Sequence, residues 1–189
     1  MPLDGFALAL DGFEAVIAAV PAGAWDAPSP CASWTAADVA GHVIGDLRAV
    51  EALATGRDNE EGVNLAQPRS AAGHDPLSAW RAARADMMSV LGPAALARPV
   101  PLPWGEQLPL GEFLERYPLE ILVHTWDLAQ ATGQRAMLDP GLVHDALEPA
   151  RQFAPAGRAA GLIGPECAVT AADDDLTRLL AVFGRRAAR

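Results

Sequence analysis

The most telling stretch of this sequence is Leu119-Glu120-Ile121-Leu122-Val123-His124-Thr125-Trp126-Asp127-Leu128, which predicts a buried helix. On a helix, Glu120, His124 and Asp127 share one face, with neighbouring Cβ atoms roughly 5–6 Å apart. This spacing is typical of metal ligands. Burying a carboxylate and an imidazole without compensation is costly or changes their protonation state. Two compensations stay open at this point: a bound cation, or an internal Glu–His hydrogen bond or arginine partner.

The composition limits the class of protein. A length of 189 residues predicts one domain. The sequence has no apolar run of roughly 20 residues, so we expect no membrane span. Its first residues lack the basic start of a secretory signal, so we expect a cytoplasmic protein. The formal net charge of −10 argues against a nucleic-acid partner.

The basic residues and the cysteines exclude some chemistry. All 14 basic residues are arginine, which removes Schiff-base lysines and the phosphate-binding lysine of nucleotide-binding loops. Cys31 and Cys167 are far apart, and neither belongs to a C-x-x-C pair. We therefore interpret both as reduced thiols and favour structural roles, with a reactive thiol as the alternative for Cys31, which precedes a helix start.

Helical periodicity with N-cap and stop signals predicts a mainly α protein, a four-helix bundle with a short β-hairpin and a small C-terminal helical and strand extension. The bundle occupies about residues 1–135 and the extension about 136–189, within a single domain. The expected elements are bundle helices over 4–20, 36–54, 76–91 and 111–131, a hairpin over 100–110, further helices over 140–153 and 173–183, and a strand over 166–170.

The helix over 36–54 supplies a third candidate ligand. Its apolar stripe includes His42, which a bundle would direct inward. His42, Glu120 and His124 form a two-histidine, one-glutamate set, which suits zinc or nickel and leaves coordination positions open. Asp46 and Asp127 each follow a histidine by one turn, so each is either a further ligand or an acceptor that orients an imidazole. For Asp127 we favour the orienting role.

Other polar segments lie around this predicted site. The stretch from Arg57 to Gly73 is polar and contains Gly, Asn and Pro, so it is interpreted as a long loop that could overhang the site. Gly41, beside His42, suggests close approach of another backbone or a ligand. His74 and His144 have no partner pattern and are assigned to the surface.

Several of these residues carry a family resemblance. Trp34, Asp38-x-x-x-His42 and especially Glu120-x-x-x-His124-Thr125-Trp126-Asp127-Leu128-Ala129-x-Ala131-Thr132-Gly133 resemble the metal-binding domain of mycothiol-dependent maleylpyruvate isomerases, within the DinB-like superfamily. The chain looks most like the stand-alone metal-binding proteins of that group. The resemblance implies a DinB-like bundle with a metal held by His42, Glu120 and His124.

The resemblance also suggests a function. The first hypothesis is a thiol-dependent transferase or isomerase, in which zinc holds a small thiol, such as mycothiol, as a thiolate nucleophile toward an electrophilic substrate. The second is a non-catalytic metal-binding or small-ligand-binding protein of the same fold. A hydrolase that uses zinc-bound water ranks third. An exposed face of the bundle could also support a homodimer.

Overall fold

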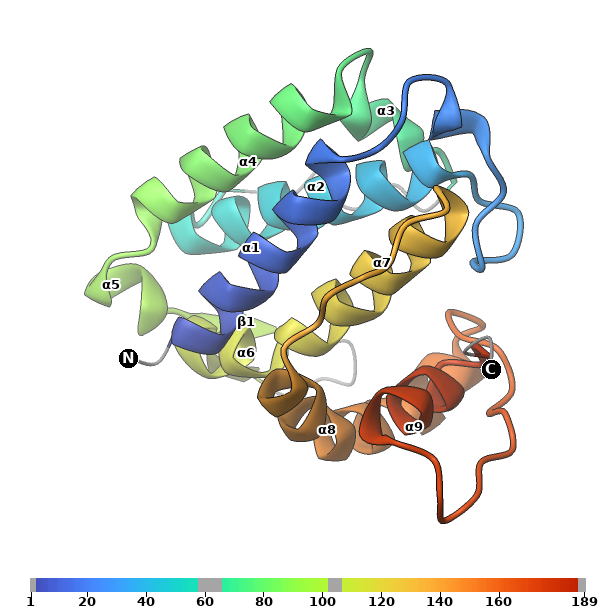
Figure 1. Ribbon diagram of the computed structural model, residues 1–189. Coiled ribbons are helices and arrows are strands. Elements are labelled where there is room, and N and C mark those ends of the chain that lie inside the picture. The colour runs from blue at the N-terminus through green and yellow to red at the C-terminus, as the bar shows by residue number, and fades with distance from the viewer. Residues whose placement is uncertain (1–2, 58–65, 102–106, 187–189) are drawn as a thin grey trace.

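The computed structural model describes residues 3–57, 66–101 and 107–186, and its main feature is a four-helix bundle. The bundle helices are α1 (Asp4–Ala18), α2 (Ala36–Thr55), α4 (Pro76–Val90) and α7 (Pro118–Ala131). Helix α1 packs on α4 and α7, and α2 packs on the same two helices (Figure 1). The predicted mainly α bundle is therefore confirmed.

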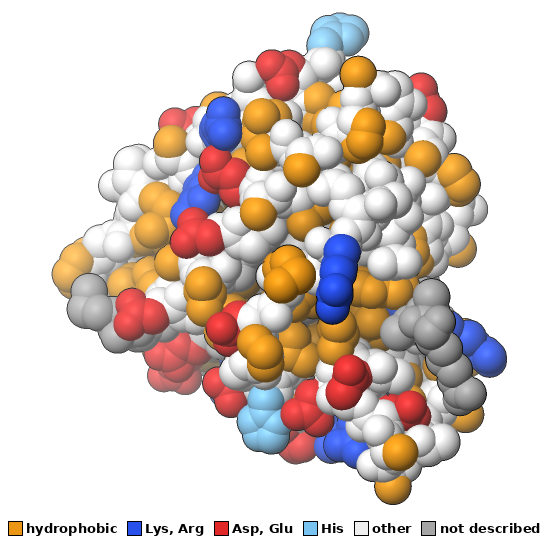
Figure 2. Space-filling model, in the orientation of Figure 1, with side chains coloured by type: hydrophobic (Ala, Val, Ile, Leu, Met, Phe, Trp, Pro, Cys, Tyr) orange, Lys and Arg blue, Asp and Glu red, His pale blue; other side chains and the backbone are white. Residues whose placement is uncertain are grey.

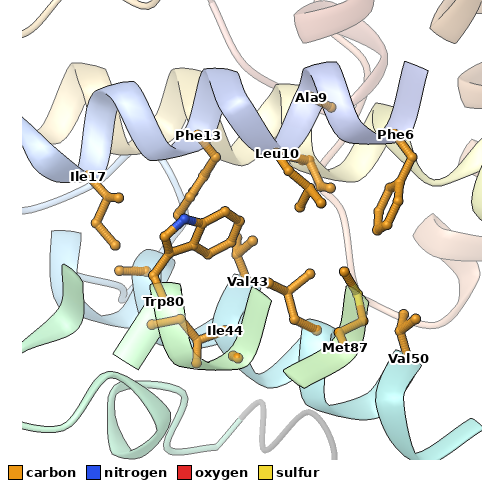
Figure 3. Close-up of a cluster of buried hydrophobic side chains, with 14 of the residues drawn as sticks. Phe6, Ala9, Leu10, Phe13, Ile17, Val43, Ile44, Val50, Trp80 and Met87 are labelled. Carbon is orange, nitrogen blue, oxygen red and sulfur yellow. The ribbon is translucent and has the colours of Figure 1, made fainter. Parts of the chain in front are cut away.

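Apolar side chains on one face of α1 build the bundle core. Phe6, Leu10, Phe13 and Ile17 recur every three or four residues and point toward α2 and α4 (Figure 3). The ring centroids of Phe13 and Trp80 lie 4.6 Å apart, and both side chains are fully buried. This packing fixes the bundle helices relative to one another, and α2 and α7 are the two helices that present the candidate ligands.

Helix α2 begins and ends as its sequence predicts. The Thr35 hydroxyl accepts a hydrogen bond from the Asp38 backbone N–H, and the Asp38 carboxylate accepts one from the Thr35 N–H, which completes a capping box. The helix ends at Gly56, whose φ of +71° is the left-handed conformation that glycine adopts at low cost.

A short helix, α3 (Arg69–Ala72), packs against α2 where a loop over 57–73 is predicted. Residues 58–65 of that loop lie outside the described residues. A Cβ atom at Gly41 would lie only 2.1 Å from the backbone oxygen of Pro68. The glycine beside His42 therefore permits close approach of another backbone, one of the two explanations that its position in a helix suggested.

The helix predicted over 111–131 is two helices, so this prediction was wrong. Helix α6 (Leu110–Arg116) ends at Tyr117, and α7 begins at Pro118. Proline has no N–H to donate, and its ring clashes with the carbonyl four residues earlier, so it begins a new helix instead of continuing the old one.

Between α4 and α6 lie the short helix α5 (Pro93–Leu96) and the predicted hairpin. Strands β1 (Pro99–Pro101) and β2 (Gln107–Pro109) pair in antiparallel fashion, with Val100 opposite Leu108. The predicted turn around residues 104–105 lies outside the described residues. The hairpin is short because prolines at both ends of its ladder cannot donate a backbone hydrogen bond.

The C-terminal segment forms a second layer against α7. It contains α8 (Pro140–Ala159) and α9 (Asp175–Val182), with a smaller apolar cluster that includes Val143, Leu147 and Leu179. Helix α8 runs six residues past the predicted end at Phe153 and contains Pro149 and Pro155. Its buried stripe continues to Ala154 and Gly157, so packing sustains a helix that two prolines would otherwise interrupt.

The strand predicted over 166–170 is absent, which is a second wrong prediction. Within the described ranges, β1 and β2 pair only with each other, and no strand lies beside 166–170 to complete a ladder. The Cys167 N–H instead donates to the Ala181 carbonyl. A short apolar run without a partner strand therefore forms no ladder.

The described helices and the surface carry two further observations. None of these helices combines the length and the apolar character needed to cross a bilayer. On the face shown in Figure 2, apolar side chains gather in the middle and acidic side chains gather in the lower part, where Figure 1 places α8 and α9.

Candidate metal centre

Helix α7 carries three of the predicted site residues on one face. Its apolar residues Ile121, Leu122 and Val123 are buried, so the helix is held between the bundle and the C-terminal layer. Glu120 lies in the first turn, where the positive end of the helix dipole favours a carboxylate. His124 and Asp127 follow at the predicted spacing, and both are buried.

His42 reaches the same place from α2. Its Nε2 lies 3.2 Å from Oε1 of Glu120, and the Nε2 of His124 lies 3.0 Å from the same oxygen. The three donor atoms lie within 4.8 Å of one another. The histidine side chains are about nine-tenths buried, whereas 27% of the Glu120 side chain is exposed. This group, named the Glu120 cluster, is therefore accessible from the Glu120 side.

The ring of His124 cannot satisfy both of its neighbours as a neutral imidazole. Nδ1 lies 3.0 Å from Oδ2 of Asp127, and Nε2 faces Glu120, yet a neutral ring carries one proton. Burial opposes a positive charge here, but hydrogen bonds to Asp127, Cys31 and Glu120 raise the pKa of His124 well above its ordinary value. The site requires a positive charge, either on this ring or on a cation beside Nε2.

His42 points to the same requirement. Its Nδ1 is buried and has no hydrogen-bond partner among the described residues, while Nε2 faces Glu120 and lies 3.5 Å from Oδ2 of Asp46. Burial opposes ionisation of Glu120, but hydrogen bonds from His124 and His42 hold the pKa of this carboxyl well below its usual range. An ionised carboxylate between two imidazole nitrogens fits a divalent cation that accepts N and O donors.

Asp46 lies beside His42 in the Glu120 cluster and contacts Tyr117, a residue that the sequence did not indicate. The Tyr117 hydroxyl donates to Oδ2 of Asp46 at 2.5 Å. Burial raises the pKa of Asp46 from 3.8 to about 6, with opposing effects from its charged neighbours. Burial also raises the pKa of Tyr117, so this hydroxyl stays a donor. The sequence feature that could have indicated Tyr117 is Pro118. A proline at this position starts a new helix, so Tyr117 lies at the junction of α6 and α7.

Asp127 lies on the other side of the His124 ring, in a group named the Asp127 cluster. Arg185, from the turn after α9, donates through Nε and Nη2 to the two carboxylate oxygens at 3.2 and 2.8 Å. The Cys31 thiol donates to Oδ2 at 3.1 Å. Burial opposes its charge, but hydrogen bonds from His124 and Arg185 lower the pKa of Asp127. The predicted orienting contact between Asp127 and His124 is thus present in the structure.

For Cys31 the sequence favoured a structural role and left reactivity as the alternative, and it gave no indication of Arg185. Cys31 Sγ, a His124 nitrogen and an Asp127 oxygen lie within 4.8 Å of one another, as metal ligands do. The Arg185 Nη2, however, lies 2.9 Å from that Sγ and supplies the positive charge itself. The other two histidines, His74 and His144, are exposed as predicted, and His144 pairs with Asp175 at 2.8 Å.

Trp34 packs beside both histidine rings of the Glu120 cluster. Its ring centroid lies 5.1 Å from that of His42 and 6.1 Å from that of His124, nearly parallel to the latter. The Trp34 side chain is half-buried. It shields one side of the imidazoles from water and strengthens their electrostatic interactions.

These features define a helix-bundle protein with two histidines and one carboxylate converging between α2 and α7, backed by a carboxylate–arginine pair. The chain belongs to the mycothiol maleylpyruvate isomerase N-terminal domain family, whose sequence model matches residues 6–129. The resemblance inferred from the sequence is thereby confirmed.

Individual relatives and solved structures agree with this assignment. The chain is 31% identical over 170 residues to the uncharacterized proteins MT0763 and Rv0738 of Mycobacterium tuberculosis, a match that covers 87% of this chain and 81% of each relative. A crystal structure of the mycothiol-dependent maleylpyruvate isomerase matches with a TM-score of 0.63 at 18% identity. A histidine-to-alanine variant of that enzyme matches with a TM-score of 0.60 at 17% identity. Both matches cover 81% of this chain and 68% of the enzyme, and they establish the shared fold.

Proposed function

We propose that this protein is a thiol-dependent transferase or isomerase that uses a divalent metal, zinc being the first candidate, held by His42, Glu120 and His124. The proposal is carried by one observation: two imidazole Nε2 atoms face one carboxylate oxygen, and the other nitrogen of His124 is already committed to Asp127. The ligand set suits zinc and leaves open positions for a substrate atom.

The thiol is proposed from the family. Its sequence model is that of mycothiol maleylpyruvate isomerase, so mycothiol is the first candidate thiol for this chain. A zinc ion in the Glu120 cluster would bind the sulfur of a small thiol and hold it as the nucleophilic thiolate at neutral pH. An electrophilic carbon of a small substrate is the corresponding reaction partner.

The residues of the chain have separable roles in this proposal. Glu120 is the most exposed member of its cluster, so substrates approach from its side. Trp34 covers the imidazoles and limits access of water. Asp46, buried and hydrogen-bonded by Tyr117, lies beside His42 and is the proposed acceptor for the proton of an incoming thiol.

The experiment is an activity assay of zinc-loaded protein with mycothiol and a panel of electrophiles that includes maleylpyruvate. We expect a metal-dependent rate in the wild-type protein, none in His124→Ala, and an unchanged rate in the matched control His144→Ala, which loses only an exposed ion pair. No rate above that of His124→Ala across the panel would overturn the enzymatic proposal. Tight zinc binding without turnover would favour a non-catalytic metal-binding protein.

A further inference from the structure

The turn after α9 directs an arginine from the C-terminal layer back into the bundle. Gly184 has a φ of +76°, and a Cβ atom at this position would lie 2.9 Å from the Pro165 backbone oxygen. The Arg185 N–H donates to the Leu180 carbonyl, and its Nη1 donates to the Phe183 carbonyl. The backbone and one end of the guanidinium are therefore fixed by α9 itself.

The other end of this guanidinium is fixed by the Asp127 cluster. Nε and Nη2 hold both oxygens of Asp127, and Nη2 also contacts Sγ of Cys31. Only 11% of the Arg185 side chain is exposed, and Asp127 is fully buried. A two-point contact to a buried carboxylate fixes both the position and the plane of that carboxylate.

The carboxylate in turn fixes His124. Oδ2 of Asp127 lies 3.0 Å from Nδ1, so with a metal ion bound the ring would donate its Nδ1 proton to Asp127 and direct the Nε2 lone pair toward the Glu120 cluster. We propose that Arg185 is a positioning residue of the metal centre, and that metal binding and docking of the α8–α9 layer are coupled through Arg185, Asp127 and His124. This inference rests on the proposed metal site but does not require that the protein be an enzyme.

Coupling of this kind is reciprocal. If the docked layer improves the geometry of His124 for metal, then bound metal must stabilise the docked layer by the same free energy. The α9 end should therefore respond to zinc, although it contributes no ligand. The amides of Gly184 and Arg185 report on this docking because both donate to carbonyls of α9.

The first experiment compares Arg185→Gln with Arg186→Gln. Both variants remove one arginine charge, but Arg186 is exposed and is not part of the Asp127 cluster. Zinc affinity is measured by competition with a chromophoric chelator. We expect Arg185→Gln to bind zinc roughly 10-fold more weakly, in line with residues that orient metal-bound histidines, and Arg186→Gln to bind like the wild-type protein. Arg185→Lys should recover only part of the loss, because an ammonium lacks the planar fork.

The second experiment uses a signature that a general loss of stability would not produce. In the zinc-loaded wild-type protein, ¹⁵N NMR should show the His124 ring protonated at Nδ1, with a slowly exchanging proton, and Arg185→Gln should exchange that proton faster. Hydrogen exchange of the 184–185 amides in the wild-type protein should slow when zinc is added, which needs no variant.

The outcomes separate the two proposals. Equal zinc affinity and equal Nδ1 proton exchange in Arg185→Gln and Arg186→Gln would overturn the role of Arg185 while leaving the metal site intact. Unchanged exchange of the 184–185 amides on zinc addition would overturn the coupling. Failure of the wild-type protein to bind zinc would overturn both the proposed function and this inference.

Discussion

Glu120 and Asp127 flank the same imidazole, but their surroundings differ. Asp127 is fully buried and accepts hydrogen bonds from Arg185, Cys31 and His124. Glu120 is partly exposed and faces two imidazoles, and no arginine in the described ranges hydrogen-bonds to it. Asp46 adds a second acidic group on the Glu120 side. The Asp127 cluster contains its own cation, whereas the histidines are the sources of positive charge that the described residues give the Glu120 cluster.

This difference explains why the two groups with metal-ligand spacing have different roles. A metal ion beside Asp127 would have to displace a guanidinium that already satisfies the carboxylate, at the cost of leaving a buried arginine unpaired. A metal ion beside Glu120 would supply charge that the cluster lacks. The charges therefore support the proposal that the Glu120 cluster binds the metal and the Asp127 cluster supports it.

The largest effect is expected from Glu120→Gln. This change keeps the shape of the side chain but removes the ligand charge, so zinc affinity should fall by roughly 1,000-fold, beyond the roughly 10- to 100-fold cost of changing a supporting residue. The metal-free protein should lose less stability than Asp127→Asn does, because the hydrogen-bond partners of the partly exposed Glu120 are two imidazoles and not a buried guanidinium. Chelator competition and urea denaturation check the two parts, and unchanged zinc affinity would contradict the assignment of Glu120.

A large loss of stability is expected from Asp127→Asn. Loss of this charge leaves the buried guanidinium of Arg185 without its ion-pair partner, so the metal-free protein should lose about 4 kcal/mol of its free energy of unfolding. Urea denaturation measures this loss. The matched control is Asp175→Asn, whose partly exposed pairs with His144 and Arg178 should together contribute no more than about 1 kcal/mol. Equal losses in the two variants would remove the distinction between the two clusters.

The pH dependence of the free energy of unfolding tests the environment of Asp46. Because burial raises its folded-state pKa from 3.8 to about 6, the folded protein binds this proton more tightly than the unfolded chain does. The resulting stabilisation is complete below pH 3.8 and is lost as the pH rises through about 6.

In the metal-free protein, the free energy of unfolding of the wild type, relative to that of Asp46→Asn, should therefore fall by about 3 kcal/mol across this window. Urea denaturation at a series of pH values measures the difference. If the free energies of unfolding of the two proteins changed in parallel with pH, the raised folded-state pKa of Asp46 would be contradicted.

The smallest effect expected is from Gly41→Ala, beside His42. The new methyl group would meet the Pro68 backbone and displace α3 from α2, at a cost of about 2 kcal/mol. The control is Gly12→Ala in α1, where a Cβ atom meets nothing within 4 Å and should stabilise the helix by up to about 1 kcal/mol. Thermal unfolding compares them, and a neutral Gly41→Ala would contradict the close approach of α3.

The sequence predicted those parts of the fold and site that depend on local spacing. The bundle helices follow from apolar periodicity and caps, and Glu120, His124 and Asp127 meet because they occupy one face of one helix. His42 required only that the stripe of α2 face inward. The metal role of these residues stays a prediction that the proposed experiments test.

The remaining contacts depend on tertiary packing. Cys31 precedes Asp127 by 96 residues and Arg185 follows it by 58, and no local pattern marks either as a neighbour. The strand predicted over 166–170 failed because strand formation needs a partner, which the segment itself does not reveal. Pro118 itself indicates a helix break. The prediction of one helix over 111–131 followed the apolar periodicity, which continues on both sides of the proline.

The break at Pro118 also bears on how this chain tolerates insertions and deletions. In one continuous helix, a residue inserted near Phe113 would rotate everything downstream by about 100° and turn Glu120 and His124 away from His42. Because α7 begins anew at Pro118, the angular position of its proposed ligands is set by its own proline and core contacts. We therefore expect a change in the length of α6 to leave the arrangement of His42, Glu120 and His124 in place.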